Sequence, residues 1–220
     1  MTNSMHRVRQ IALACTAAWA LVACGGGSGG SSNAAVSNGT PSTGFSGQDA
    51  SAPIATNNIA TDGLNWINYR RGQIGMPALT HNGVIDTAAQ GHSDYQRINN
   101  VVTHDQTAGK PGFTGVDLGA RLKAAGYTFV GENAIGEVIS ATTNGTGFYM
   151  AEELITAIYH RFVIFEPMFK EIGTGAATSS GNYNYFTADF VANNGYGSGI
   201  AAGTLVTWPF SGQTQVPANF

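Results

Sequence analysis

Apolar residues recur every three or four positions in three stretches of the chain, which is the spacing of one face of an α-helix. These stretches are residues 59–74, 82–99 and 150–162. The third is the most amphipathic, and its apolar side consists of Leu154, Ile155, Ile158 and Phe162. A shorter helix is predicted over residues 118–125, ended by Gly126. The pattern therefore predicts four helices.

Side chains that alternate with a period of two predict strands in the second half of the chain. Residues 171–177 and 183–192 form a predicted hairpin, joined through Ser180-Gly181-Asn182. A further strand is predicted over residues 127–138, interrupted by Gly131-Glu132-Asn133. Helices grouped around such strands pack in layers. The predicted fold class is α+β, an α/β/α sandwich with a central antiparallel sheet flanked by helices.

The first 23 residues have the pattern of a signal peptide. Arg7 and Arg9 precede an apolar stretch over residues 11–23, which is shorter than the roughly 20 residues that a membrane-spanning helix needs. The stretch ends Leu21-Val22-Ala23-Cys24, which resembles the lipobox of bacterial lipoproteins. We therefore expect cleavage before Cys24 and lipidation of its thiol. The alternative is an ordinary signal peptide, with Cys24 incidental.

Composition divides the rest of the chain into three parts. After Cys24, residues 25–56 are mostly Gly, Ser, Ala, Asn and Thr, so residues 24–56 are predicted to be a disordered tether. The folded domain is expected over residues 57–195. Residues 196–220 form a C-terminal extension with one apolar run, which we expect to pack on the domain.

Charge and cysteine content narrow the classes of function. Charged residues make up only 10% of the 220 residues, the formal net charge is −3, and no Lys/Arg cluster exceeds two residues. Nucleic-acid binding is therefore not expected. The two cysteines, Cys15 and Cys24, both lie in the N-terminal segment, so the domain contains no disulfide and no thiol nucleophile.

Seven short motifs follow one another through the predicted domain. They are Asn68-x-x-Arg71, Ala89-x-x-His92-Ser93, His104, Arg121 with Ala125-Gly126-Tyr127, Gly131-Glu132-Asn133, His160-Arg161 and Ile172-Gly173-x-Gly175. In this order and spacing the chain resembles the CAP superfamily of cysteine-rich secretory, antigen 5 and pathogenesis-related proteins, in its shorter bacterial branch. The disulfides and the Gly-His-Tyr-Thr-Gln segment of eukaryotic members are absent, and Leu154 stands where a tryptophan is often found.

The resemblance implies a cleft in which two histidines and two acidic residues converge. His104 and Glu132 match the first histidine and an acidic residue of the family, and His160 is the second histidine by the His-Arg pattern. Imidazole and carboxylate suit a divalent metal such as zinc, and they suit acid–base exchange near neutral pH. His104, His160 and Glu132 are therefore candidate metal ligands and candidate catalytic residues. The fourth cleft residue stays open, because Glu153 and His160 are separated by about 10.5 Å of rise in one continuous helix.

Each candidate also has a structural alternative. His104 could be an ordinary loop histidine, Glu132 could bond backbone amides, and His160 could stabilise a helix C-terminus. His92 is expected to be a hydrogen-bonded core histidine, and His81 a solvent-facing turn residue. The two remaining motif residues, Asn133 and Arg121, are expected to organise the cleft rather than react.

Three functions are compatible with this sequence. The first is a binding module anchored to the bacterial envelope, with the outer membrane favoured because Gly25 follows the cysteine; its ligand would be a lipid, a peptide or cell-wall material. The second is a metal-assisted hydrolase of peptide or cell-wall substrates. The third is a structural surface protein. No HExxH, GxSxG, Walker or dinucleotide motif in a suitable setting points elsewhere. We expect a monomer.

Overall fold

The computed structural model describes residues 44–216, so the predicted signal peptide and Cys24 lie outside the described residues. In chain order its elements are α1 (Ile59–Gln73), β1 (Thr80–His81), α2 (Gly83–Asn99), α3 (Leu118–Ala124), β2 (Ala134–Thr142), α4 (Gly147–Thr156), α5 (Ile158–Ile164), β3 (Glu171–Thr178) and β4 (Asn184–Ala192). The four strands form one sheet in the order β1-β3-β4-β2. Strand β4 is antiparallel to both of its neighbours, β2 and β3, whereas the short β1 is parallel to β3.

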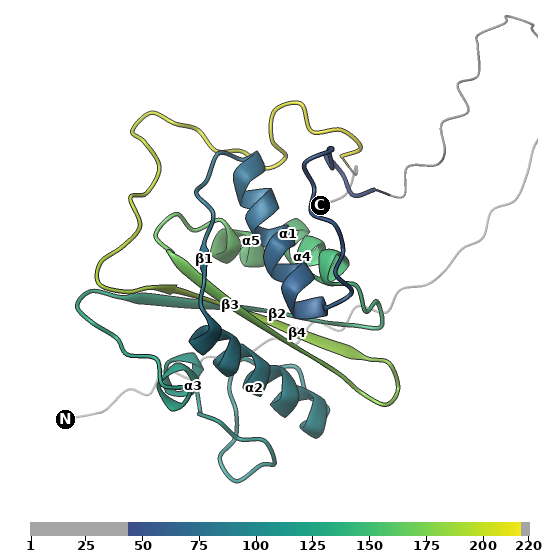
Figure 1. The fold of residues 1–220 in the computed structure, drawn as a ribbon, viewed down its shortest axis with the longest axis vertical. Helices are drawn as coiled ribbons and strands as arrows, with labels where there is room; N and C mark the ends of the chain where they lie inside the picture. The colour runs from purple at the N-terminus through teal and green to yellow at the C-terminus, as the bar shows by residue number, and fades with distance from the viewer. Residues whose placement is uncertain (1–43, 217–220) are drawn as a thin grey trace, which may run out of the picture. The chain divides into compact units, whose positions relative to one another are not determined.

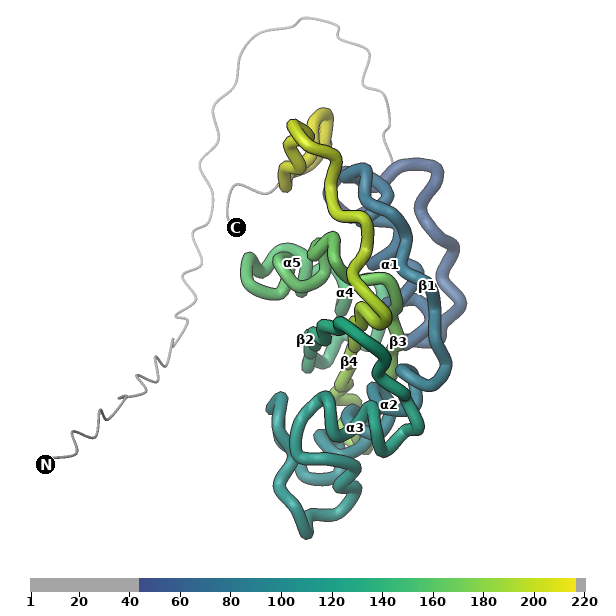
Figure 2. The backbone as a smooth tube through the Cα atoms, turned by 90° about the vertical axis from the view of Figure 1, so that its left-hand side faces the viewer, coloured from purple at the N-terminus to yellow at the C-terminus, as the bar shows by residue number. Residues whose placement is uncertain are grey.

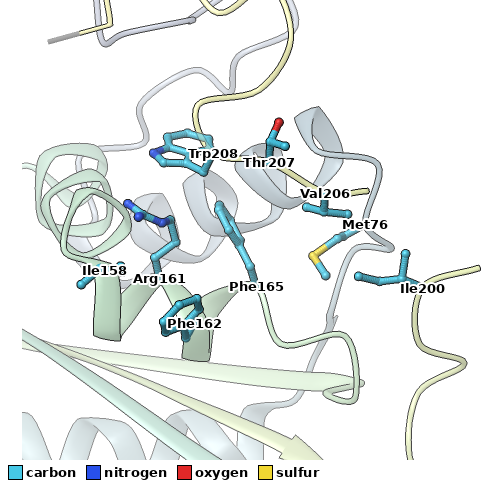
Figure 3. Close-up of a pocket in the computed structure, with 9 residues that line it drawn as sticks. All are labelled: Met76, Ile158, Arg161, Phe162, Phe165, Ile200, Val206, Thr207 and Trp208. Carbon is cyan, nitrogen blue, oxygen red and sulfur yellow. The ribbon is translucent and has the colours of Figure 1, made fainter. Parts of the chain in front are cut away.

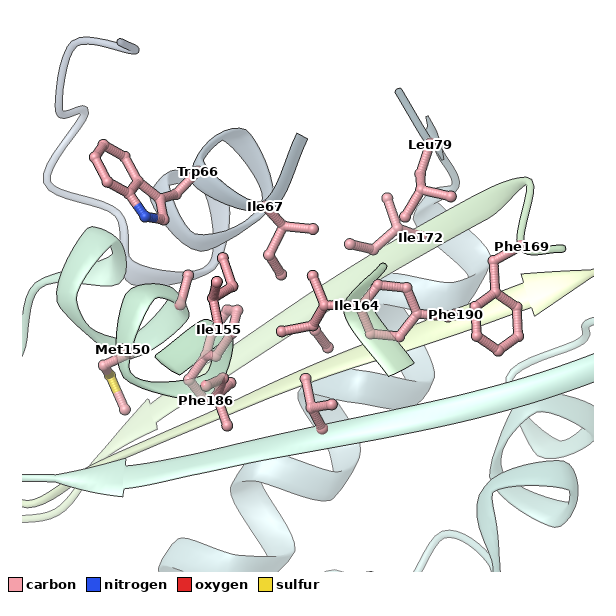
Figure 4. Packing of buried hydrophobic residues seen from close by; sticks show 14 of the residues in the cluster. Trp66, Ile67, Leu79, Met150, Ile155, Ile164, Phe169, Ile172, Phe186 and Phe190 are labelled. Carbon is pink, nitrogen blue, oxygen red and sulfur yellow. The ribbon is translucent and has the colours of Figure 1, made fainter. Parts of the chain in front are cut away.

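Helices cover both faces of this sheet, which confirms the predicted α+β class (Figure 1). Helices α1, α4 and α5 lie on one face, and α2 and α3 lie on the other. The larger core, on the first face, includes Trp66, Ile67, Met150, Ile155, Ile164, Ile172, Phe186 and Phe190 (Figure 4). The smaller core, on the second face, contains Ile85, Ala88, Leu122, Tyr127 and Val191. Each large apolar side chain buried in these cores contributes about 1.5–3 kcal/mol to folding.

Two glycines of β3 allow α2 to lie directly against the sheet. A Cβ atom at Gly175 would lie 2.2 Å from the backbone nitrogen of Gln90, and one at Gly173 would lie 2.3 Å from that of Asp86. No side chain fits at either position. The Ile172-Gly173-x-Gly175 motif therefore has a packing role.

The helices begin at side-chain caps. The side chain of Asn58 accepts a hydrogen bond from the amide of Thr61, and Asn82 and Asp117 cap α2 and α3 in the same way. Asp62 lies inside α1, where its carboxylate accepts hydrogen bonds from the amides of Thr56 and Asn57. Asp62 thus holds the preceding segment against the helix.

The predicted helix over residues 150–162 is two helices, because the backbone turns at Ala157. This residue has the extended conformation (φ −83°, ψ 117°) and separates α4 from α5. The guanidinium group of Arg161 donates hydrogen bonds to the carbonyls of Ile155 and Thr156, at 3.0 and 3.2 Å. These bonds satisfy carbonyls that the break would otherwise leave without helical partners.

The strand predicted over residues 127–138 is displaced: β2 starts at Ala134. The preceding residues are held by the side chain of Asn193 and by the backbone amides of Asn194 and Gly195 instead of a strand ladder. Asn193 accepts a hydrogen bond from the amide of Val130 and donates one to the carbonyl of Thr128. The Gly131-Glu132-Asn133 motif consequently lies in a loop.

Both ends of the described segment pack on the domain. The folded domain therefore begins before the predicted boundary at residue 56. Arg70 donates to the carbonyl of Ser46, and Phe45 packs against Trp66 with ring centroids 4.9 Å apart. The amide of Gly47 donates to the carbonyl of Thr214 at 2.8 Å, which ties this segment to the C-terminal one. Within residues 44–216, no helix has the length and apolar character needed to cross a bilayer.

Candidate functional site

The centre of the site is Glu137, the single charged residue of β2. Arg121 of α3 donates from Nη2 to Oε2 of Glu137 at 2.5 Å. His104 Nδ1 lies 2.8 Å from Oε1 of the same carboxylate. Arg121 also donates from Nη1 to the carbonyl of His104 at 2.8 Å. One buried arginine therefore fixes both the carboxylate and the loop that carries the histidine.

Burial and charge act in opposite directions on these groups. Burial raises the pKa of Glu137, but the hydrogen bond with His104 and the charge of Arg121 outweigh it, and the net shift is downward. The hydrogen bond with Glu137 raises the pKa of His104 above its ordinary value of 6.5. The Glu137 side chain is 5% exposed, whereas that of His104 is 61% exposed. His104 is thus the solvent-facing end of a buried charge cluster.

His92 lies behind this cluster and is a core residue, as predicted. Its Nε2 lies 2.8 Å from the carbonyl of Thr103, and its Nδ1 accepts a hydrogen bond from Gln106 at 3.0 Å. Burial lowers its pKa. The neutral imidazole, protonated at Nε2, satisfies both partners.

Asp189 of β4 is a second buried acid and stands directly opposite Glu137 in the ladder. It is fully buried, and apart from the neighbouring carboxyl of Glu137 neither of its carboxyl oxygens has a hydrogen-bond partner among the described residues. Burial, with the negative charge of Glu137 next, raises its pKa well above the ordinary value. The carboxyl pair therefore holds one ionised group, Glu137, and one group that favours its neutral form.

Glu132 does not occupy the position predicted for it. It is exposed in the loop before β2, and its side chain makes no hydrogen bond or ion pair with any residue described here. The acid that meets His104 is Glu137, because β2 begins after the Gly131-Glu132-Asn133 motif. A partial sequence signal for Glu137 and Asp189 did exist: each is the single charged residue of its strand, although the strand pattern alone does not show which way its side chain faces.

His160 and Glu153 lie on the other side of β2, in α5 and α4. Burial lowers the pKa of His160 first, the charge of His104 lowers it further, and Glu153 raises it. The three groups therefore share one electrostatic neighbourhood. Because the helix breaks at Ala157, the separation between Glu153 and His160 that was expected for one continuous helix does not apply. Glu153 accepts a hydrogen bond from Ser140 of β2, and Nδ1 of His160 is buried without a partner among the described residues.

The donor set does not fit a closed metal site. Among residues 44–216, no three His, Cys, Asp or Glu side chains are grouped so that they could hold a metal ion. Nδ1 of His104 faces Glu137, whose other oxygen is bonded to Arg121. The predicted ligand set of His104, Glu132 and His160 is therefore not assembled, because its carboxylate is in the exposed loop.

The surface beside this cluster is hollowed. A cavity of about 530 Å³ is lined by His104, Asp105, Asp117, Leu118, Gly119, Ile135, Gly136 and Glu137. A separate apolar hollow of about 280 Å³ lies between α5 and the C-terminal segment, where Phe162, Phe165 and Trp208 line it (Figure 3). Its one charged group, Arg161, already bonds the last carbonyls of α4. The first hollow is the candidate site, since it holds the ionisable cluster.

The fold and the site together define a class of protein. It is an α/β/α sandwich that carries a buried acid–arginine–histidine cluster at the edge of its sheet. The sequence model of the cysteine-rich secretory protein (CAP) family matches residues 64–190. The chain belongs to this family. No match is found among curated proteins.

Two solved structures share the fold. An extracellular protein containing an SCP domain from Bacillus anthracis str. Ames is 23% identical, with a TM-score of 0.53; the match covers 65% of this chain and 45% of that chain. An outer surface protein from Borrelia burgdorferi is 13% identical, with a TM-score of 0.52; the match covers 64% of this chain and 97% of that one. The matched region thus spans less than half of the Bacillus protein.

Proposed function

We propose that this protein is a recognition module displayed on the bacterial cell envelope, and that it binds its ligand in the hollow at His104. The observation that carries the proposal is the buried Glu137 carboxylate behind an exposed imidazole. Holding an ion pair inside a protein is costly and adds little net stability. Ionisable groups arranged in this way within a hollow favour a functional role.

Binding accounts for the geometry better than catalysis. The carboxylate of Glu137 is neutralised by Arg121 on one oxygen and bonded to His104 on the other. It therefore orients the imidazole and leaves Nε2 of His104 as the polar group offered to a ligand. The described residues contain no cysteine and no serine paired with a histidine, so no activated nucleophile supports a hydrolytic mechanism.

The proposed location on the cell envelope rests on the N-terminal sequence. Cys24 would carry the lipid, and the chain after it would let the domain stand away from the membrane surface. Two solved proteins of similar fold are described as extracellular and as an outer surface protein, which agrees with display outside the cytoplasm.

Co-sedimentation tests this proposal. The full chain is mixed with purified peptidoglycan sacculi and, separately, with vesicles of phosphatidylethanolamine and phosphatidylglycerol. We expect one of these materials to carry the protein into the pellet, and His104→Ala to abolish that binding. The matched control is His81→Ala, since His81 is also exposed but lies at the start of α2. Equal pelleting of both variants, or no pelleting at all, contradicts the proposal.

The metal-assisted hydrolase is the second candidate, favoured by the unpartnered buried Nδ1 of His160 within electrostatic reach of His104. It requires an ion held by these imidazoles with an open coordination position. Calorimetric titration of zinc into the full chain decides it. Binding that is lost in both His104→Ala and His160→Ala supports the hydrolase, and heat that is equal in all three proteins removes it.

A further inference from the structure

Helix α5 carries large apolar side chains on its outer surface. Ile158, Tyr159 and Phe162 are 51%, 82% and 63% exposed. At positions i, i+1 and i+4 they fall within about 100° around the helix axis. The two polar residues of the helix are turned to the protein, since Arg161 donates to carbonyls at the end of α4 and Nδ1 of His160 is buried. The outer surface of α5 is therefore apolar.

This apolar surface continues from α5 onto the C-terminal segment. The apolar hollow of about 280 Å³ is lined by two residues of the helix and three of the segment, which we call the apolar face: Ile158, Phe162, Ile200, Val206 and Trp208 (Figure 3). Figure 2 shows the C-terminal segment on the same side of the sheet as α1, α4 and α5. The segment contains no acidic, basic or histidine side chain. Covering the face therefore takes no charge of this segment out of water.

The composition of the apolar face fits the interface of a lipid bilayer. Contiguous apolar areas on the surface of a folded domain mark interaction sites. Tryptophan and tyrosine are enriched at the level of the lipid headgroups, because each ring is apolar in its body and polar at its tip. Trp208 belongs to the face, and Tyr159 follows Ile158 on α5. The face thus combines aliphatic side chains with aromatic rings of the interfacial type.

The chain enters the folded domain beside the apolar face. Gly44, the first described residue, lines another hollow of about 310 Å³ together with Thr156 and Trp208. Trp208 borders both hollows, and Thr156 ends α4 just before α5 begins. The N-terminal end of the described domain and the apolar face therefore lie on the same side of the domain.

The lipid proposed on Cys24 keeps a bilayer close to that side. Residues 25–43 connect Cys24 to Gly44, and a Gly- and Ser-rich chain of this length has a root-mean-square span of about 25 Å. A domain of this size is about 40 Å across. Because the connection is shorter than the domain, the side that contains Gly44 faces the bilayer. A surface within reach of such a tether has a high effective concentration, so even a small apolar face can dock on it.

We propose that the apolar face docks on the bilayer that holds the acyl chains of Cys24, and that Ile158, Phe162 and Trp208 insert between its lipids. Apolar faces that bind in this way lie about 5–10 Å into the boundary between headgroups and acyl chains. This inference rests on the lipid anchor of the proposed function and adds the surface of the domain that lies against the membrane. A second copy or another protein would have to reach this face from solution, whereas the bilayer is always within reach.

Quenching of tryptophan fluorescence by brominated lipid tests the docking. The lipidated chain is purified from the membranes of cells that produce it and reconstituted in phosphatidylcholine vesicles. The lipid is either ordinary or carries bromine on the upper part of its acyl chains, where it quenches only tryptophans that reach that depth. We expect brominated lipid to quench the part of the emission that Trp208→Phe removes. A neutral lipid suffices, because the proposed contact is apolar.

Paired substitutions provide the matched test. Ile158→Ser with Phe162→Ser removes two exposed side chains of the apolar face. Val102→Ser with Val130→Ser removes two side chains of similar exposure, 57% and 53%, in loops elsewhere on the domain. We expect the first pair to lower the equilibrium constant for docking by about tenfold or more, because the apolar area of two side chains is no longer buried. The second pair should leave the quenching of Trp208 unchanged, and circular dichroism should be the same in both.

Three outcomes overturn the inference. Unquenched Trp208 in a chain that still sediments with sacculi through His104 would exclude docking and leave the recognition function intact. A chain recovered only in the soluble fraction would remove the anchor and the docking together. A dimer in sedimentation velocity that Ile158→Ser with Phe162→Ser dissociates would assign the apolar face to a second copy. Quenching of Trp208 without any binding that depends on His104 would instead support docking and contradict the recognition function.

Discussion

Glu137 and Asp189 are direct cross-strand partners, and they place two carboxyl groups side by side beneath α2 and α3. Arg121 and His104 bond Glu137, whereas Asp189 has no hydrogen-bond partner among the described residues other than Glu137 itself. The site is therefore asymmetric: the pKa of Glu137 is lowered, and burial and the charge of Glu137 raise the pKa of Asp189. This asymmetry gives the pair a defined dependence on pH.

Asp189→Asn should raise the free energy of unfolding at pH 7, on the order of 1 kcal/mol, because it removes a buried acid beside another acid. The raised pKa of Asp189 means that folding takes up a proton once the pH exceeds the ordinary value of 3.8. The contribution of Asp189 to the free energy of unfolding therefore falls as the pH rises from 3.8 through the pKa of Asp189 in the folded protein. Urea unfolding between about pH 4 and pH 7.5 should show the advantage of Asp189→Asn growing with pH. Asp105→Asn, an exposed acid, is the control, and a loss of stability at pH 7 in Asp189→Asn would contradict the neutral form.

Glu137→Gln should destabilise the protein by about 3 kcal/mol, because it leaves the buried guanidinium of Arg121 without a counter-charge. It should also lower the pKa of His104, since the hydrogen bond with Glu137 raises it. NMR titration of the His104 ring and urea unfolding measure the two effects. Glu132→Gln is the matched control and should change neither. A shift of the His104 titration in Glu132→Gln but not in Glu137→Gln would mean that Glu132, not Glu137, is the partner.

The interaction between His104 and Glu137 also makes the stability of the folded protein depend on pH. The folded pKa of His104 is raised, so its contribution is fully present below 6.5 and is lost as pH rises through the folded pKa. Thermal unfolding from about pH 5 to pH 8.5 should show this loss in the wild-type protein. His104→Ala should lack that component, and His81→Ala should retain it.

Trp208→Ala should lower the free energy of unfolding by about 2 kcal/mol, less than a fully buried tryptophan would because Trp208 is half-buried. Its ring packs against Phe165 and Phe210, at 5.5 and 5.7 Å between centroids, and lies over the guanidinium of Arg70 at 5.4 Å. Differential scanning calorimetry measures the change, with the exposed Leu205→Ala as control. Removal of residues 196–220 should lower the Tm further. An unchanged Tm would show that the C-terminal segment is not part of the folded unit.

Cys24→Ala should move the protein from the membrane fraction to the soluble fraction of cells that produce it, because the acyl chains on this thiol would be its anchor. Fractionation followed by immunoblotting measures the partition. Cys15→Ala keeps the anchor and should leave the protein in the membrane fraction. If Cys24→Ala stays with the membrane, the protein is held there by other means.

Sequence patterns located most of the helices and the hairpin. The helix predicted over residues 82–99 is α2, and the hairpin predicted over residues 171–192 is β3 and β4, each within one residue at its boundaries. Both are specified locally, by side-chain periodicity and by turn residues. The motif order also led to the family, which the match over residues 64–190 confirms.

The candidate site was predicted only in part, since the sequence cannot show which acid of a strand region faces inward. The predicted set contained His104, which lies in the cluster, and Glu132, which was named because the family motif contains it and which lies in the exposed loop; Glu137 was not among the predicted residues. Asp189 and Arg121 become members of the cluster only when β4 and α3 pack around β2. Their pairing depends on strand register, which is settled by the burial of both faces of the sheet at once.

The sequence by itself therefore determined most of the local elements, the family and an N-terminal segment with the features of a lipoprotein signal. Only the tertiary structure decided that Glu137 rather than Glu132 meets His104, that the chain turns at Ala157, and that residues 44–56 pack on the domain. The first set depends on neighbours along the chain. The features that the tertiary structure decided depend on residues that are distant in the sequence and are buried together. A buried charge or carbonyl is tolerated only where the fold supplies its partner.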